Sequence, residues 1–341
     1  MSAGSLQSFL SRLVRHEDLT HFEAGQLLEA LLDDESTDAQ IAATLVALSA
    51  KGETREELAG LASGLRSRAV KLHSGHRCFI DTAGTGSSLA KTFNISTAAA
   101  FVIAASGLPV AKHGNRAASS RSGSADVLSA LGVNVSALPA LSESALNEIG
   151  ICFMFAPLYH GATARVAGIR RQMGIHTTFN LIGPLSNPAG APRQIVGVWR
   201  RDLTERLAEV LALLGTERSW VVHGEDGLDE ITLNGKTFVA EARNGEVTTF
   251  EIEPESFGLE RSALDHLRGG DAEANARIIL DVLSCRRKDE ARSLVIMTAA
   301  AALVIGELTA DHRTAAQLAS KAIDSGAALE KLERLKTATS E

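Results

Sequence analysis

The first part of the chain, residues 1–72, has the apolar spacing of amphipathic helices. The repeating apolar positions are Leu6, Phe9, Leu10, Leu13, Val14, Ile41, Leu45 and Leu48. Two capping boxes, Thr20–Glu23 and Thr54–Glu57, each predict a helix start. A cationic cluster late in the last helix (Arg66, Arg68 and Lys71) suits the helix dipole, and we favour that interpretation over an anion site. We therefore expect a small all-helical domain over residues 1–72.

From residue 73 onward, short apolar runs alternate with longer helical patterns, which is typical of an α/β layer structure. We expect strands at Cys78–Asp81, Pro109–Lys112, Ile151–Phe155, Ile195–Trp199 and Trp220–His223. We expect helices at Ile95–Ser106, Ser122–Leu131, Ala162–Met173, Leu203–Leu214, Ala272–Ser284, Ala291–Leu308 and Arg313–Lys336. Two alternating runs flank Arg243–Glu246, whose central Asn-Gly pair predicts a β-hairpin. Residues 73–341 are thus expected to form a larger α/β domain.

The composition of the chain limits the classes of function that are compatible with it. The chain of 341 residues carries a formal net charge of −7 and only 4% aromatic residues, which disfavours a general nucleic-acid binder. An anionic ligand would need a local cationic site. The longest apolar runs are too short to span a bilayer, and the charged first twenty residues do not resemble a signal peptide. Three widely spaced cysteines without a CxxC motif indicate buried thiols in a reducing compartment. We expect a cytoplasmic protein with no membrane partner.

The stretch from Asp81 to Leu131 combines three features that bind phosphate. Gly84 and Gly86 follow a predicted strand and would form an anion-binding turn of backbone N–H groups. The tetrapeptide Asn94–Thr97 opens an apolar helix, whose N-terminus favours phosphate. The run KHGNRAASSRSGS then gathers cations and hydroxyls. Each feature has a structural explanation alone, as a turn, a cap or a solvated run. Together, at the ligand edge of an α/β sheet, they predict a polyphosphate site.

A distant pair of acids, Asp229 and Glu230, follows another predicted strand within HGEDGLDE. Adjacent acids are usually a solvated surface pair. Beside a polyphosphate, however, their repulsion from the ligand requires a bridging cation, and carboxylates suit hydrated Mg²⁺. We therefore expect a loop that holds Mg²⁺ through these two side chains.

Four long motifs, TFNISTAAAF, KHGNRAASSRSGSADVLSALG, FNLIGPLSNPA and HGEDGLDEIT, resemble the anthranilate phosphoribosyltransferase family. The resemblance covers nearly the whole chain. It implies a small helical domain and a larger α/β domain with a mixed central sheet flanked by helices. It also implies a homodimer formed through the small domains and a segment near residues 168–188 that crosses back to the small domain. The implied activity is transfer of the phosphoribosyl group from phosphoribosyl pyrophosphate to anthranilate, with Mg²⁺.

The resemblance also assigns roles to matching residues. Phosphoribosyl pyrophosphate would contact Gly84, Thr92, Asn94, Ser96, Thr97, Lys112, His113, Asn115, Ser120 and Ser124, together with the loop residues Ser87 and Ser88. Anthranilate would contact Gly84, Asn115 and Arg170, and the guanidinium fork of Arg170 suits its carboxylate. The magnesium sites would use Ser96, Asp229 and Glu230. No residue is assigned as a general base, and we interpret His113 and His160 as structural histidines.

The chain departs from the family pattern at three places. Ser87-Ser88 replaces a usual Gly-Asp, His160–Thr163 replaces His-Pro-Ala-Met, and His176 stands where an arginine is common. These differences leave open a related phosphoribosyltransferase with another aromatic acceptor. A second alternative is a non-catalytic relative that binds nucleic acid, which the acidic balance disfavours. The similar fold of pyrimidine nucleoside phosphorylases is disfavoured by KHGNR and by the lack of a long extra C-terminal domain.

Overall fold

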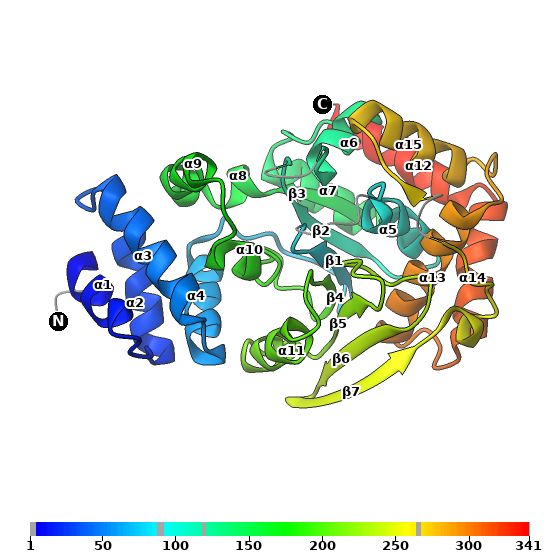
Figure 1. Ribbon diagram of the computed structural model, residues 1–341. Coiled ribbons are helices and arrows are strands. Elements are labelled where there is room, and N and C mark those ends of the chain that lie inside the picture. Colours follow the sequence, from blue (N-terminus) through cyan, green and yellow to red (C-terminus); the bar gives the residue numbers. More distant parts are fainter. Residues whose placement is uncertain (1–4, 87–91, 118–120, 264–266, 341) are drawn as a thin grey trace.

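The computed structural model describes residues 5–86, 92–117, 121–263 and 267–340, which form two lobes (Figure 1). The small lobe begins with four helices: α1 (Leu6–Val14), α2 (His21–Leu32), α3 (Asp38–Lys51) and α4 (Arg55–Arg68). Both predicted capping boxes are present, at Thr20 and Thr54. A third, in which Thr37 pairs with Gln40, starts α3 and was not predicted.

The large lobe is built on one seven-stranded mixed sheet in the order β3-β2-β1-β4-β5-β6-β7. The strands are β1 (Ile80–Gly84), β2 (Val110–Gly114), β3 (Ile151–Phe155), β4 (Arg193–Gly197), β5 (Arg218–Gly224), β6 (Thr237–Arg243) and β7 (Glu246–Ile252). Strands β1 to β5 pair in parallel, and β6 and β7 are antiparallel additions at one edge. The predicted hairpin is confirmed, because Asn244 and Gly245 both have positive φ angles, 52° and 87°, as a tight hairpin turn requires.

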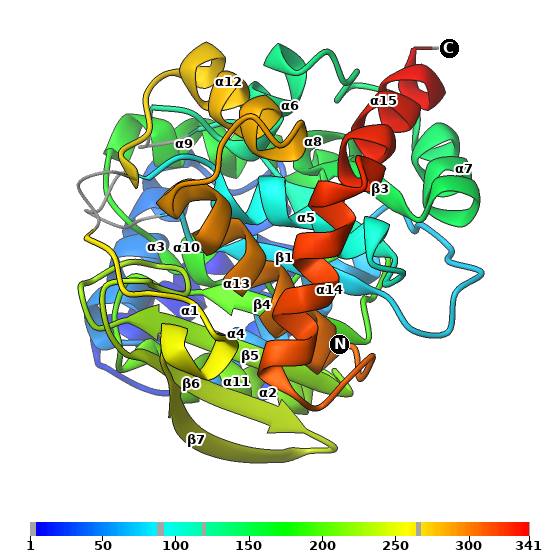
Figure 2. The ribbon, with the colours of Figure 1, turned by 90° about the vertical axis from the view of Figure 1, so that its right-hand side faces the viewer.

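Helices cover both faces of the sheet. They are α5 (Ile95–Ala105), α6 (Ser124–Ala130), α7 (Pro139–Ile149), α11 (Leu203–Leu213), α12 (Ala272–Leu283), α13 (Glu290–Ile305), α14 (His312–Asp324) and α15 (Ala327–Thr339). Figure 2 shows α13, α14 and α15 in front of the sheet, with the buried α5 among them. Alternate strand residues face opposite cores, so Ile195 packs towards α5 and α13 while Val196 packs towards α11.

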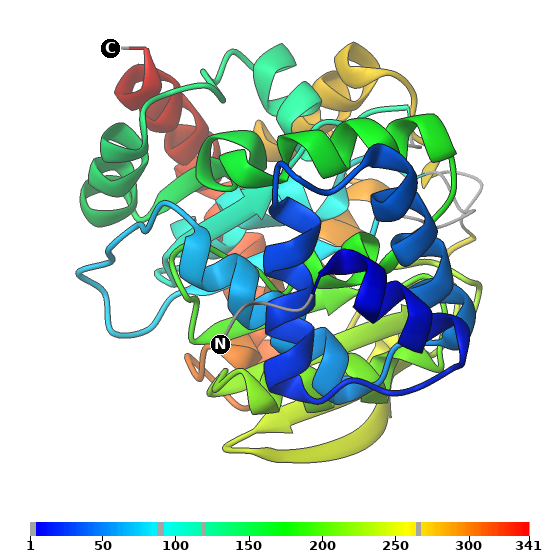
Figure 3. The ribbon, with the colours of Figure 1, turned by 90° about the vertical axis from the view of Figure 1, so that its left-hand side faces the viewer.

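The connection from β3 to β4 runs over the small lobe. It contains α8 (Ala156–Tyr159), a 3₁₀ turn (Gly161–Thr163), α9 (Ala164–Met173) and α10 (Thr178–Ile182). Helix α9 packs against α2 and α3, and α10 packs against α3 and α4, as the view onto the small lobe shows (Figure 3). Residues far apart in sequence therefore share one core with the helical bundle.

Arg66 links the small lobe to this connection. Its guanidinium donates from Nε to the Leu185 carbonyl at 2.7 Å and from Nη1 to the Leu214 carbonyl at 3.2 Å. Burial lowers its pKa to about 10. Arg66 therefore does more than complement the dipole of its own helix, because its hydrogen bonds to the Leu185 and Leu214 carbonyls connect the small lobe to the large one.

The structure corrects one predicted element. The helical pattern at 313–336 is two helices, α14 and α15, which are separated at Ser325–Gly326. Gly326 has a φ of 78° and breaks the helix, because right-handed helical backbone has negative φ. All three cysteines are free thiols, but only Cys152 is buried as predicted, whereas Cys78 and Cys285 are partly exposed. Among the described residues, no helix is both long and apolar enough to cross a membrane.

Candidate active site

The order of the parallel strands reverses between β1 and β4, and ligands of open α/β sheets bind at the carboxyl ends of strands at such a point. Gly84 and Gly197 are register partners and end their strands side by side. The turn continues from Gly84, where the Thr85 N–H donates to the Gly197 carbonyl at 2.9 Å. The predicted phosphate-binding glycine turn therefore begins at the topological switch point.

The acidic loop after β5 packs directly over these strand ends. A Cβ placed on Gly197 would lie 1.8 Å from the Asp229 carbonyl oxygen, and one on Gly84 would lie 3.9 Å from that same atom. A side chain at 197 is therefore incompatible with the observed loop position. Gly197, which was not among the predicted site residues, is what lets Asp229 and Glu230 approach the glycine turn.

Three of the predicted residues, Lys112, Ser96 and Glu230, meet in a cluster around the buried ammonium of Lys112. The Lys112 ammonium donates to the Thr82 carbonyl and lies 3.2 Å from Thr82 Oγ1 and 3.4 Å from Ser96 Oγ. Ser96 also hydrogen-bonds to Glu230. Burial lowers the pKa of Lys112, an effect opposed by the nearby Asp81 and Glu230 carboxylates. Strand β2, helix α5 and the acidic loop thus place their polar groups together.

The electrostatics of this cluster fit a bound divalent cation. Burial, together with the neighbouring Asp229 charge, raises the pKa of Glu230 to about 8. A cation would relieve that repulsion. The donor set of Ser96, Asp229 and Glu230 is all oxygen, as Mg²⁺ prefers, and leaves positions for water and substrate oxygens. The described residues contain no group of three or more His, Cys, Asp or Glu placed to hold a metal, so such a site would depend on other oxygen ligands.

Two of the predicted phosphate-binding features touch each other. We call the start of α5, at Asn94–Thr97, the first phosphate wall and the cationic run Lys112–Ser124 the second phosphate wall. Asn94, just before α5, donates from Nδ2 to the Ser122 carbonyl at 3.4 Å and accepts from Ser122 Oγ at 3.3 Å. In the second wall, the Asn115 carbonyl accepts from Ser124 Oγ at 3.4 Å. Thr97 is only 1% exposed and its hydroxyl is enclosed in the core, so the structure does not bring it to the surface of the site. Ser87, Ser88 and Ser120 lie outside the described residues.

Asp126 organises the second wall and was not predicted to do so. Its carboxylate accepts from the backbone N–H groups of Ala117 and Gly123, each at 2.9 Å, and from Arg116 at 2.9 Å. These hydrogen bonds hold the pKa of Asp126 below its usual range. Asp126 thus connects Arg116 and Ala117 with Gly123, near the other end of the cationic run. It also lies in the first turn of α6.

The two histidines pack together, with ring centroids 5.1 Å apart. Burial is the main cause that lowers the pKa of His113 to about 3, with smaller contributions from His160 and Lys112. Burial also lowers the pKa of His160. Both rings hydrogen-bond backbone groups of the connection from β3 to β4, His113 at Gly183 and His160 at Ser186. Each is therefore a neutral, structurally engaged imidazole at neutral pH, and a weak base.

Arg170 extends from α9 and is oriented by neutral partners. Its Nε donates to Thr177 Oγ1 and its Nη2 to Asn180 Oδ1, both at 2.9 Å, and the guanidinium lies 5.4 Å from the centre of the Phe179 ring. No ion pair to Arg170 is found in the described parts of the chain, and burial lowers its pKa. Because these partners are neutral, the positive charge of this half-buried guanidinium remains available to pair with a bound anion. Thr177 and Asn180, which orient Arg170, were not among the predicted site residues, although Asn180 lies in the motif FNLIGPLSNPA.

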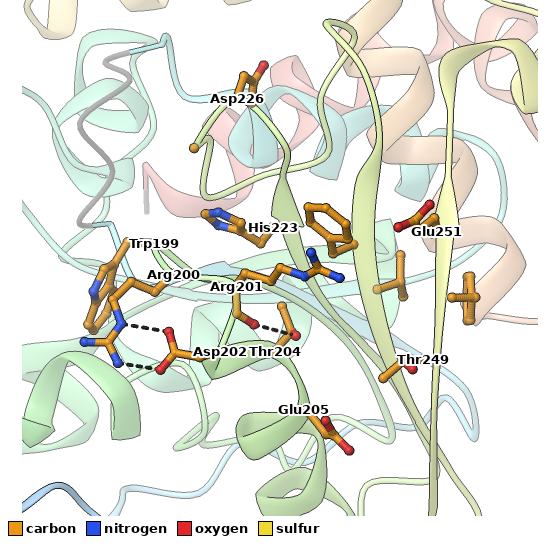
Figure 4. Close-up of a pocket in the computed structure, with 14 residues that line it drawn as sticks. Trp199, Arg200, Arg201, Asp202, Thr204, Glu205, His223, Asp226, Thr249 and Glu251 are labelled. Carbon is orange, nitrogen blue, oxygen red and sulfur yellow. Dashed lines mark hydrogen bonds and ion pairs between the residues drawn. The ribbon is translucent and has the colours of Figure 1, made fainter.

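A cavity of about 1140 Å³ lies beside the acidic loop (Figure 4). Its walls come from residues 199–202, 204 and 205, from His223 near the end of β5, from Asp226 in the acidic loop, and from the β6–β7 hairpin. Arg200 is paired with Asp202, and the Arg201 guanidinium lies 3.6 Å from the Phe238 ring centre. None of the residues predicted to bind substrate or metal lines this cavity.

Similarity to known proteins agrees with this geometry. The "Glycosyl transferase family, helical bundle domain" matches residues 7–69, and the "Glycosyl transferase family, a/b domain" matches residues 76–329. Two proteins named anthranilate phosphoribosyltransferase, from Desulfosudis oleivorans and Moorella thermoacetica, are 46% and 47% identical in sequence to this chain. They align over 96% and 97% of both chains. The chain belongs to the anthranilate phosphoribosyltransferase family.

Solved structures of the family have the same fold. The Thermus thermophilus enzyme superposes with a TM-score of 0.92 at 39% identity, covering 98% of this chain and 99% of that one. A Saccharomyces cerevisiae enzyme in complex with PRPP and Mg gives a TM-score of 0.89 at 27% identity, covering 98% of both chains. The same yeast enzyme in complex with 4-fluoroanthranilate gives 0.89 at 26% identity, covering 99% of both. The predicted fold class, with its helical domain and mixed sheet, is confirmed.

Proposed function

We propose that this protein transfers the phosphoribosyl group of phosphoribosyl pyrophosphate to the amine of anthranilate. The reaction would take place at the carboxyl ends of β1 and β4. The products are N-(5-phosphoribosyl)anthranilate and pyrophosphate, in tryptophan biosynthesis. The observation that carries the proposal is the convergence of the glycine turn, the α5 N-terminus, Lys112 and the acidic loop at one switch point. Identity over nearly the full length of anthranilate phosphoribosyltransferases supports it.

The donor half would lie between the two phosphate walls. The N–H groups at the start of α5, with Asn94 and Ser96, would bind pyrophosphate oxygens, and Lys112 would add a buried positive charge. As the C1–O bond of the sugar breaks, negative charge grows on the departing pyrophosphate. Groups already fixed in place stabilise that charge without reorganisation, which lowers the barrier. The large burial of Lys112 strengthens this effect, because the local dielectric is low.

Ser96, Asp229 and Glu230 would hold Mg²⁺, as their oxygen donors and mutual repulsion favour. The bound ion would supply charge neutralisation for the pyrophosphate. The role of this chain is to fix the ligands: the Asp229 backbone rests on Gly197, and Ser96 is held by Lys112.

The acceptor half would lie at Arg170, Asn115 and Gly84. The free charge of Arg170 would pair with the anthranilate carboxylate and aim the amine at C1. An aromatic amine is already a nucleophile, so the reaction needs no strong base to start it. The low pKa values of His113 and His160 agree with a reaction driven by orientation and by leaving-group stabilisation.

We further propose a cytoplasmic homodimer that assembles through the small lobe. Three large apolar side chains on its helices are strongly exposed: Val14 (64%), Phe22 (69%) and Val46 (44%). Apolar surface of this kind favours burial against a partner. Light scattering should give twice the chain mass, and Phe22→Asp should shift it towards the monomer. Three free thiols suit a reducing compartment.

The test is an acceptor panel. Purified protein is mixed with phosphoribosyl pyrophosphate, Mg²⁺ and one aromatic amine at a time, and the product is identified by mass spectrometry. Turnover with anthranilate at least tenfold above any other acceptor supports the proposal. Preference for another amine would establish the altered-acceptor alternative. Salt-sensitive nucleic-acid binding without any turnover would establish the non-catalytic one.

A further inference from the structure

A segment far along the chain packs onto the first phosphate wall. Residues 267–275, here the Gly-Gly segment, pass beside Thr92 and Phe93. Thr92 pairs with Arg268 in an antiparallel bridge, and the Phe93 N–H donates to the Leu267 carbonyl at 3.3 Å. A Cβ on Gly269 would lie 2.5 Å from the Thr92 carbonyl oxygen. The Gly-Gly segment therefore sits against the backbone that leads into Asn94 and α5.

Asn275, in the first turns of α12, ends this segment and is 2% exposed. Its Nδ2 donates to Asn94 Oδ1 at 3.0 Å and to Ser122 Oγ at 2.8 Å, while its Oδ1 accepts from the Gly270 N–H at 2.7 Å. The Gly270 N–H can only donate, which fixes the orientation of the amide. Both donors of Asn275 are thus committed to the two phosphate walls.

The two contacted residues belong to different walls. Asn94 precedes α5, and Ser122 lies in the loop after β2; they also hydrogen-bond each other. Asn275 therefore completes a three-residue network that couples the walls. The amide is too deeply buried to serve as a substrate contact itself. A buried amide costs free energy unless its polar atoms are hydrogen-bonded, and those of Asn275 bond to Asn94, Ser122 and Gly270.

We propose that Asn275 is a positioning residue for the donor site, holding Asn94 and Ser122 in the orientation that receives phosphoribosyl pyrophosphate. The inference rests on the proposed function. It predicts that loss of the amide selectively weakens the binding of phosphoribosyl pyrophosphate, because Asn94 and Ser122 are no longer held in a fixed position relative to each other. Of the proposed anthranilate contacts, Arg170 lies in a different element and Asn115 makes no hydrogen bond to Asn275, so anthranilate binding should change much less.

Asn275→Asp is the main test, because it keeps the size and the acceptor for Gly270 but removes both donors. We expect the KM for phosphoribosyl pyrophosphate to rise about tenfold, as loss of a buried hydrogen bond that strands its partners predicts, with the KM for anthranilate changed less than twofold. Ile279→Ala is the matched control: it removes a fully buried side chain from the same helix without touching the network. It should lower Tm and leave both KM values within twofold.

Two further variants keep the proposal testable if Asn275→Asp does not fold. Ser122→Ala and Asn275→Ala should each raise the donor KM, and the double variant should raise it by less than the product of the two, because they share one network. Unchanged donor KM in the variants, with a normal wild type, would overturn the positioning role alone. A wild type without phosphoribosyl transfer would overturn the proposed function and this role with it.

Discussion

Gly197→Ala should disable the active site while leaving the fold largely intact. The added methyl group would lie 1.8 Å from the Asp229 carbonyl oxygen and 2.7 Å from its carbonyl carbon, both parts of the backbone. Real Cβ contacts are essentially never below 3.0 Å, so the acidic loop must move by at least about 1.2 Å. A misplacement of about 1 Å in a catalytic constellation can cost roughly 100-fold in rate. We therefore expect kcat/KM to fall at least about 100-fold.

The cost in folding stability should be about 1–3 kcal/mol, as for other overpacked sites. The assay measures kcat/KM as a function of Mg²⁺ concentration, together with urea unfolding. The half-saturating Mg²⁺ concentration should rise, because Asp229 and Glu230 are carried by the displaced loop. Gly25→Ala is the control, since its nearest neighbour, the Gly60 carbonyl, is 3.8 Å away in the distant small lobe. Wild-type activity and Mg²⁺ dependence in Gly197→Ala would refute the proposed loop position.

Three further predictions concern Arg170, the acidic pair and His113. Arg170→Lys loses the fork-shaped guanidinium, so the KM for anthranilate should rise about 10–100-fold in steady-state assays while the KM for the donor stays within twofold. Asp229→Asn combined with Glu230→Gln should abolish Mg²⁺-dependent turnover yet leave circular dichroism unchanged; retained turnover would contradict the metal assignment. The pKa of His113 is about 3 when folded and ordinarily 6.5, so its stabilising effect is complete above pH 6.5 and is lost as the pH falls. Urea unfolding should show about 2 kcal/mol less stability at pH 5 than at pH 7 from this group, and His113→Gln should flatten that slope.

Much of the fold could be predicted because its signals are local. The strands of the parallel sheet are short buried apolar runs, and the hairpin is marked by Asn244-Gly245. The break between α14 and α15 was missed because Gly326 interrupts an amphipathic pattern that continues on either side. Arg66 was assigned only to its own helix, because its carbonyl partners lie more than a hundred residues away.

In the active site, too, the features with a local sequence signal could be predicted, and those that depend on long-range contacts could not. The glycine turn, the start of α5, the cationic run and the acidic pair are each visible as contiguous motifs. Their supports are not, because Gly197 touches Asp229 through the pairing of β4 with β5, and Asn275 touches Asn94 through the packing of α12 beside α5. A small residue at a strand end and an amide on a helix carry no local sign of such contacts. The supports therefore required the three-dimensional arrangement.

The most direct test of phosphoribosyl transfer at this site is a stoichiometric one. Anthranilate fluorescence and pyrophosphate release are followed together after the wild-type protein is mixed with phosphoribosyl pyrophosphate, anthranilate and Mg²⁺. We predict that the two change in a one-to-one ratio and that both stop when the metal is chelated. Folded protein that releases no pyrophosphate, or that releases it while anthranilate remains unchanged, would contradict the account.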